Sequence, residues 1–143
     1  MRTRTIGFAL AVLLAAVAAA LAVEPRQGGP AGMPMYDKAT EVTVQGEVTA
    51  VTTVAGRRGM SGIHVTMNAE GGPVEVHLGP ATYLEEQHFR VAKGDVIEVV
   101  GSRVTINGSV AVLARTVKKG ETVVVLRDEN GVPKWARGGR GNP

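Results

Sequence analysis

All three histidines of this chain, His64, His77 and His88, lie in one stretch between Ile63 and Phe89. Imidazole nitrogens are common ligands of zinc and copper, so a cluster of histidines can form a metal site. Histidines can equally be polar residues on the solvated face of a sheet. Which of these applies depends on the elements that position the three side chains.

Two strands expected around His64 and His77 bring these residues together. Residues 62–67 (GIHVTM) and 73–78 (PVEVHL) alternate polar and apolar side chains, as half-buried strands do, and the intervening NAEGG predicts a hairpin turn. With the turn at Glu70-Gly71, one face carries the apolar pairs Ile63–Leu78, Val65–Val76 and Met67–Val74. The other face places His64 opposite His77 and Thr66 opposite Glu75.

This register leaves two interpretations of the histidines open. Opposed Cβ atoms lie about 5 Å apart, so two imidazoles there can share a zinc or copper ion, with Glu75 as a diagonal third ligand. His88 is not placed by this argument. A structural zinc site needs four ligands, and the chain has no cysteine to complete one. We therefore expect no bound cofactor, with a copper or zinc site at His64 and His77 as the alternative.

The N-terminus indicates export. Arg2 and Arg4 precede an apolar run over residues 6–22 that ends in Ala20-Leu21-Ala22, a small-x-small cleavage signal. The pattern predicts a Sec-type signal peptide over residues 1–22, cleaved after Ala22, and a periplasmic or secreted protein. The alternative is an uncleaved anchor, because the run approaches the ~18 residues that can span a bilayer. The lack of cysteine excludes disulfides and a lipid-modified cysteine.

Composition divides the remainder into three parts. Residues 23–35 are rich in proline and glycine and are expected to form a flexible linker, residues 36–135 a folded domain, and residues 136–143 a disordered basic tail. Of 16 basic residues five lie outside residues 36–135, as does one of 13 acidic residues, which leaves 11 basic and 12 acidic residues in the domain. Nucleic-acid-binding domains are usually more basic than this.

The domain is expected to be almost entirely β-structure. Residues 41–54 alternate around Gly46, which predicts a long, bent first strand, and the hairpin described above follows. Residues 80–89 then predict a helix of two to three turns, with Thr82 and Glu85 as a capping box. Strands resume after Lys93-Gly94-Asp95, turn at Asn107-Gly108 and return over residues 109–117. Residues 121–135 add a strand and a turn at residues 129–131.

Five strands with a helix between the third and fourth is the element order of the OB-fold barrel. The predicted fold class is therefore all-β: a five-stranded OB-fold-like barrel with one short helix between strands 3 and 4, plus a C-terminal strand and turn extension. A six-stranded sandwich or open roll is the alternative.

Residues 36–117 resemble the small exported OB-fold proteins of bacteria, the periplasmic bacterial OB-fold type. The resemblance lies in VTVQGEVTAV, HLGPATYL and KGDVIEVVGSRV. Residues 125–135 look like an extension found on a subset of such proteins that accompany membrane redox or cytochrome systems. The resemblance implies an exported binding module, with a ligand that varies among relatives.

No motif of a hydrolase, metalloprotease or nucleotide-binding enzyme occurs, so the chain is predicted not to be an enzyme. OB-folds that bind nucleic acid stack bases on aromatic residues of the second and third strands, and residues 62–67 and 73–78 contain none. The expected function is that of an accessory or adaptor protein of a cell-envelope system. Metal binding and nucleic-acid binding are the alternatives.

The expected partner is a cell-envelope protein or a small ligand, with membrane contact only through an uncleaved signal or through that partner. Trp135 either anchors a partner or caps an open barrel end, since tryptophan is enriched at interfaces. The expected binding surface consists of His64, Thr66, Glu75, His77, Arg57, Arg58 and Trp135.

Overall fold

The computed structural model describes residues 26–27 and 36–137 of the 143. The predicted signal peptide, tail residues 138–143 and all of the predicted linker except Arg26 and Gln27 lie outside the described residues. Among the described residues, none of the helices has the length and apolar character needed to cross a membrane. The strands are β1 (Arg26–Gln27), β2 (Glu41–Ala55), β3 (Ser61–Ala69), β4 (Gly72–Pro80), β5 (Val96–Ile106), β6 (Ser109–Lys119) and β7 (Thr122–Val125). The helices are α1 (Ala81–Glu86) and the short 3₁₀ turns η3 (Lys38–Thr40), η4 (Arg57–Gly59) and η5 (Lys134–Arg137).

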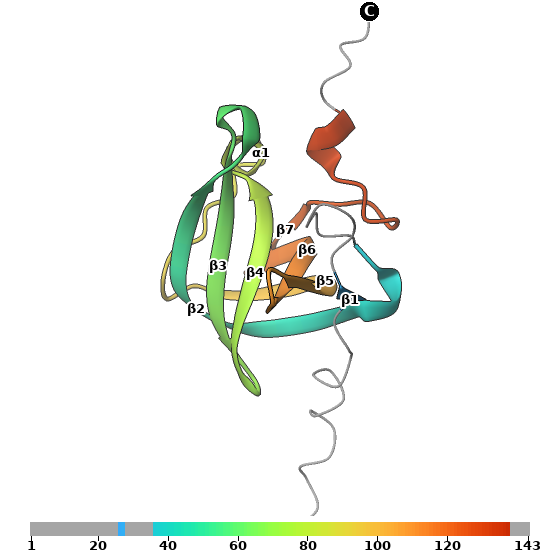
Figure 1. Cartoon of the computed structure of the whole chain (residues 1–143). Coiled ribbons are helices and arrows are strands. Elements are labelled where there is room, and N and C mark those ends of the chain that lie inside the picture. The colour runs from blue at the N-terminus through green and yellow to red at the C-terminus, as the bar shows by residue number, and fades with distance from the viewer. Residues whose placement is uncertain (1–25, 28–35, 138–143) are drawn as a thin grey trace, which may run out of the picture.

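Five strands close into a ring, which confirms the predicted OB-fold-like barrel (Figure 1). Antiparallel ladders join β5 to β2, β2 to β3, β3 to β4 and β5 to β6. A parallel pairing of β4 with β6, at Val76 opposite Val112 and His77 opposite Leu113, closes the ring. The helix α1 lies between β4 and β5, the third and fourth strands of the barrel, as the sequence predicted.

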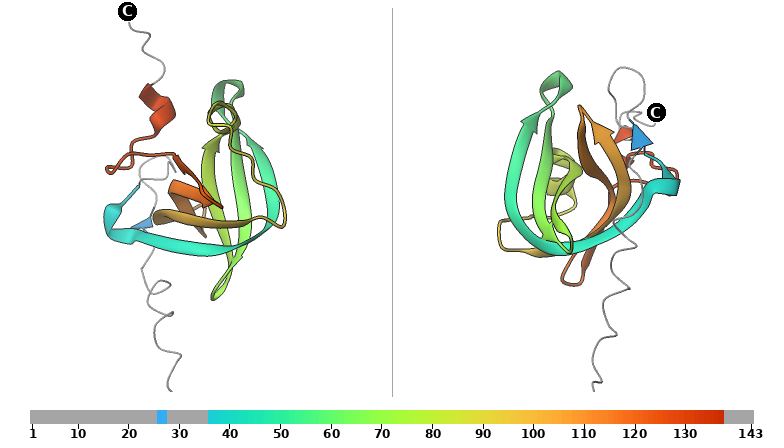
Figure 2. Two further views of the ribbon diagram at one scale, coloured as in Figure 1. Left: turned by 180° about the vertical axis from the view of Figure 1, so that it is seen from behind. Right: turned by 60° about the horizontal axis from the view of Figure 1, so that its bottom comes forward.

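The bent strand β2 belongs to both sides of the barrel. Residues 41–47 pair with β5, and residues 46–55 pair with β3, so the strand changes partner at Gly46. Figure 2 shows β2 curving from one wall of the barrel to the other. A Cβ atom at Gly46 would lie 1.9 Å from the carbonyl oxygen of Asn68, so only glycine permits this approach. A bulge between Val48 and Ala50 adds to the bend.

Alternating apolar residues of the five strands fill the barrel. Val48, Met67, Val76, Leu78 and Val99 have no exposed surface. The β3–β4 register is the predicted one from His64 to Met67, with the turn at Glu70-Gly71. The predicted pairing of Ile63 with Leu78 is wrong, because a bulge next to His64 places Ile63 opposite Gly79.

Helix α1 differs from its prediction in both length and capping. The helix begins after Pro80, which makes no side-chain capping bond, so Thr82 and Glu85 do not form the predicted capping box. It ends at Glu86 because His88 adopts a left-handed backbone, with φ 53°. The amides of His88 and Phe89 then donate to the carbonyls of Glu85 and Leu84, which is a Schellman ending. Phe89, which the sequence placed within the helix, lies beyond its end and is buried.

The C-terminal extension packs against the barrel and adds Val124 and Leu126 to its hydrophobic core. Strand β7 pairs with β6, and Arg127 and Pro133 form an isolated bridge around the turn at Glu129 and Asn130. At the other terminus, β1 pairs in parallel with residues 104–105 of β5.

Candidate metal centre and adjoining hollow

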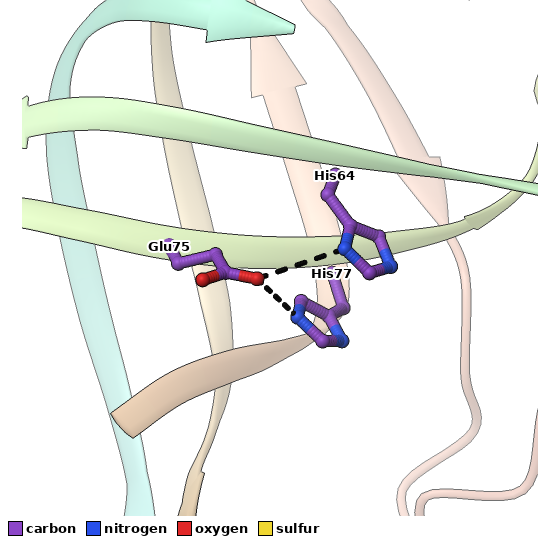
Figure 3. A group of neighbouring side chains, drawn as sticks. All are labelled: His64, Glu75 and His77. Carbon is purple, nitrogen blue, oxygen red and sulfur yellow. Dashed lines mark hydrogen bonds and ion pairs between the residues drawn. The ribbon is translucent and has the colours of Figure 1, made fainter. Parts of the chain in front are cut away.

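His64 and His77 lie side by side on the outer face of the β3–β4 hairpin (Figure 3). Their ring centroids are 3.7 Å apart, and the ring planes differ by 13°. The two rings therefore stack, which requires the direct cross-strand pairing that the sequence predicted. The neighbouring core residues Val65 and Val76 point into the barrel and fix both strands in this register.

Glu75 reaches both imidazoles from its position two residues before His77. One carboxylate oxygen, Oε1, lies 2.8 Å from Nε2 of His77 and 3.6 Å from Nδ1 of His64. The donor atoms of the three residues all lie within 4.8 Å of one another. The structure thus brings together His64, Glu75 and His77 of the predicted binding surface.

The histidines are more enclosed than the carboxylate. Their side chains are 25% and 17% exposed, whereas that of Glu75 is 45% exposed. Partial burial and the neighbouring His77 lower the pKa of His64, and the attraction of Glu75 opposes this shift. Below its lowered pKa His64 gains a charge, and above it the ring is neutral, the form in which imidazole binds metals.

Thr66, which the sequence also assigned to this face, lies opposite Glu75 as predicted. Its backbone carbonyl accepts a hydrogen bond from the Thr49 hydroxyl, at 3.2 Å, across the β2 bulge. Thr66 thus lies two residues along β3 from His64, in the next cross-strand pair of the same face.

A hollow of about 250 Å³ opens beside the two histidines. Besides His64 and His77, its walls include side chains from three separate segments: Met60, Leu113, Arg127 and Trp135. Leu113 belongs here because β6 places it beside His77 in the parallel pairing. The hollow therefore joins the histidine pair to the C-terminal extension.

Trp135 forms the wall of this hollow by packing on the backbone of β4. A Cβ atom at Gly79 would lie 2.7 Å from the indole ring, so the ring rests on the glycine itself. The Tyr83 ring lies 5.5 Å away, and the Arg127 guanidinium lies 5.0 Å from the indole centroid. Trp135 thus packs against the barrel and also contributes to the surface beside the histidines.

Arg127 is a residue of the hollow that sequence reasoning missed. Its Nη1 donates to the carbonyl of Ala114 at 2.6 Å, and burial lowers its pKa to about 10. A half-buried guanidinium next to an aromatic ring holds its position well. The sequence offered no signal for it, because its neighbours Leu126 and Asp128 belong to an irregular segment.

The predicted residues Arg57 and Arg58 lie in η4, within the loop that joins β2 to β3. Arg58 is exposed and has a left-handed backbone, with φ 58°. The same loop contributes Gly56 and Met60 to the hollow, and Met60 is 51% exposed. The loop therefore borders the candidate site, to which it contributes the side chain of Met60.

A second polar cluster joins the start of β2 to β6. The guanidinium of Arg115 donates two hydrogen bonds of 2.9 Å to the carboxylate of Glu41, and the Tyr36 hydroxyl donates to the same carboxylate. Arg115 is the chief reason that the pKa of Glu41 lies below its usual range. Burial, followed by the nearby Glu41, raises the pKa of Tyr36. These three hydrogen bonds link the start of β2 to β6, which indicates a structural role for the cluster.

Comparisons with known proteins bear on the family and add little on the fold. The comparison with curated proteins gave no significant match. Solved structures of TiaS, one in complex with a tRNA and ATP and one of a ZRD-deleted mutant with agmatine, are similar at 18% and 17% identity. Both have TM-scores of 0.42; the matches cover 65% and 64% of this chain but only 21% and 24% of the TiaS chains.

The family model is more informative because it covers the barrel itself. The model of the MamS/MamX magnetosome protein family matches residues 40–124, from the start of β2 through most of β7. The matched region is more than half of the chain and includes His64, Glu75 and His77. The chain belongs to the MamS/MamX magnetosome protein family.

Proposed function

We propose that this protein is an exported, non-enzymatic binding module that serves as an accessory or adaptor protein of a cell-envelope system. Its binding face is the outer surface of β3 and β4 together with the hollow at Trp135. Export is inferred from the predicted signal peptide at residues 1–22. Membership of the MamS/MamX magnetosome protein family supports an accessory, envelope-associated role.

The observation that carries this proposal is the meeting of three different surfaces at one hollow. The histidine pair supplies hydrogen-bonding groups, Trp135 supplies a large apolar ring, and Arg127 supplies a positive charge. Aromatic and arginine side chains are enriched where proteins bind partners. These residues come from segments far apart in sequence, so the barrel and its extension must both be folded to form the face.

Resemblance to exported bacterial OB-fold proteins supports the same proposal. In such modules the barrel is a rigid support and the ligand is chosen by surface residues, so the fold alone does not identify the partner. The lack of aromatic residues in β3 and β4 argues against the base-stacking surface that nucleic-acid-binding OB-folds use. We therefore favour an envelope protein or a small ligand as partner.

Site-specific photocrosslinking in the native host tests the binding face. A photoreactive amino acid replaces Met60, at the rim of the hollow, in the full chain. A matched variant carries it at Val110, which is 44% exposed beside the Glu70-Gly71 turn, at another hollow. We expect Met60 to capture one defined envelope protein and Val110 to capture little. Equal capture by both positions, or no adduct from Met60, contradicts the proposed face.

A further inference from the structure

We infer that His64, Glu75 and His77 form a binding site for a divalent transition-metal ion on the outer face of the β3–β4 hairpin. The inference deepens the proposed function and rests on it for the choice of face, because it names a ligand for that face. It requires no partner protein, so the two proposals can fail separately.

Distances among the three donor groups suit a shared ion. In a tetrahedral site with ligand bonds near 2.1 Å, neighbouring donor atoms lie about 3.4 Å apart. Oε1 of Glu75 lies 2.8 Å from Nε2 of His77 and 3.6 Å from Nδ1 of His64, values on either side of this separation. All the donor atoms lie within 4.8 Å of one another, so side-chain rotations can bring the three groups to one ion.

The stacked rings define the motion that binding requires. Ring nitrogens carry their lone pairs in the ring plane, and the planes here are nearly parallel, at 13°. Two parallel lone pairs cannot both point at one ion between the rings. Binding must tilt the two imidazoles toward each other at their Glu75 edges. Both residues lie on the outer face of the barrel, so this tilt leaves the core intact.

The donor set restricts the class of metal. Two imidazole nitrogens and one carboxylate oxygen suit zinc, copper(II), nickel and cobalt, whereas calcium and magnesium prefer sites made of oxygen atoms. Three protein ligands leave at least one coordination position open. The hollow beside His64 and His77 gives that position room for water or for a donor group of a bound partner.

The test is metal titration of the full chain, purified in mild detergent with an affinity tag that contains no histidine. Zinc affinity is measured by calorimetry, and cobalt(II) absorption reports the number and type of ligands. We expect one site per chain. His64→Ala and His77→Ala should each weaken zinc binding by at least about tenfold. Glu75→Gln should weaken it by a similar factor, since even the loss of a residue that only orients a metal ligand costs about 10–100-fold.

His88→Asn is the matched control. It removes the remaining histidine, which is exposed on the C-terminal side of α1, and asparagine tolerates the left-handed backbone found there. We expect it to bind zinc as the unchanged chain does. Circular dichroism of every variant confirms that the barrel is folded, so a lost site can be distinguished from a lost fold.

Two results would overturn the metal site. One is the absence of zinc, copper and cobalt binding by the folded full chain, and the other is equal binding by the unchanged chain and the His64→Ala, His77→Ala double variant. If photocrosslinking at Met60 still captures a partner in either case, the proposed binding face is supported and only the proposed metal site is wrong. If the metal binds as expected and Met60 captures nothing, the site is real and the adaptor role is wrong.

Discussion

The two polar clusters of this molecule differ in how their charges are arranged. In the Tyr36–Glu41–Arg115 cluster one carboxylate faces a guanidinium in a two-bond contact, so opposite charges compensate each other. In the His64–Glu75–His77 cluster one carboxylate oxygen is shared by two imidazoles. The two imidazole rings stack on each other, and this cluster of three residues contains no guanidinium or ammonium group that compensates the carboxylate. The Tyr36–Glu41–Arg115 cluster joins β2 to β6, whereas the histidine cluster lies on the single β3–β4 hairpin.

This difference separates residues that hold the fold from residues available for binding. A compensated pair that connects distant segments stabilises the native state, and removing one partner leaves the other uncompensated. An exposed carboxylate between two histidines contributes little to folding, because water can replace its contacts. The predictions below test this division from the largest expected effect to the smallest.

Arg115→Ala is expected to cause the largest loss of stability. The change removes the two hydrogen bonds that Arg115 donates to Glu41, at a site where both side chains are about a quarter exposed, and leaves the carboxylate with its hydrogen bond from Tyr36. Since the degree of burial of this pair is intermediate between that of exposed and that of fully buried ion pairs, we expect a loss of about 2 kcal/mol in the free energy of unfolding. Urea denaturation followed by circular dichroism measures it. Lys38→Ala is the control, because Lys38 is exposed and affects Glu41 only through its charge; an equal loss in both variants would contradict the structural role.

Gly79→Ala is expected to disturb the wall of the hollow. Gly79 has φ 150°, and an added Cβ would lie 2.7 Å from the Trp135 ring, so the ring must move away. We expect a loss of about 1–2 kcal/mol, from backbone strain together with lost packing. Trp135 is the only tryptophan, so its fluorescence reports the displacement directly, as a shift to longer wavelength. Gly94→Ala is the control, because Gly94 also has a positive φ but no atom lies within 4 Å of an added Cβ. It should destabilise the fold without changing the fluorescence.

The Tyr36–Glu41–Arg115 cluster should also make the stability of the protein depend on pH. The pKa of Glu41 is lowered, chiefly by its hydrogen bonds to Arg115, so the folded state holds this proton less tightly than the unfolded state does. The resulting stability is fully present above the ordinary glutamate pKa, near 4.5, and is lost as the pH falls through the lowered value in the folded protein. Denaturation between neutral and acidic pH should therefore show a steeper acid loss for the unchanged chain than for Glu41→Gln. If the free energy of unfolding falls equally with pH in the two proteins, the Glu41–Arg115 pair does not cause the acid loss of stability.

Sequence patterns predicted the elements whose signals are local. The alternation of polar and apolar residues predicted the barrel strands, and the Asn107-Gly108 pair predicted the turn between β5 and β6. Both residues of that turn have a positive φ. The same alternation placed His64 opposite His77, since a strand register follows from one turn and one apolar face. The predicted Ile63–Leu78 pair failed because a bulge inserts one residue without changing the apolar pattern.

Features that depend on tertiary contacts were beyond the sequence. The capping pattern at Thr82 and Glu85 was overridden by the chain leaving β4 at Pro80, one residue before the helix. Arg127 and Leu113 reach the hollow through the C-terminal extension and the parallel β4–β6 pairing, and neither contact has a local signal. The pairing of Arg115 with Glu41 spans 74 residues and was missed for the same reason.

The smallest expected effect belongs to the histidine cluster in the absence of metal. His64→Ala and His77→Ala remove side chains from the outer face, where the principal losses are ring stacking and one shared carboxylate contact. We expect each to lower the free energy of unfolding by less than about 1 kcal/mol in the presence of a chelator. Zinc at a concentration that saturates the unchanged chain should stabilise it more than either variant, because stabilisation by a ligand grows with its affinity for the folded state. A loss in the chelator as large as that of Arg115→Ala would place the histidines among the residues that hold the fold, and the contrast between the clusters would fail.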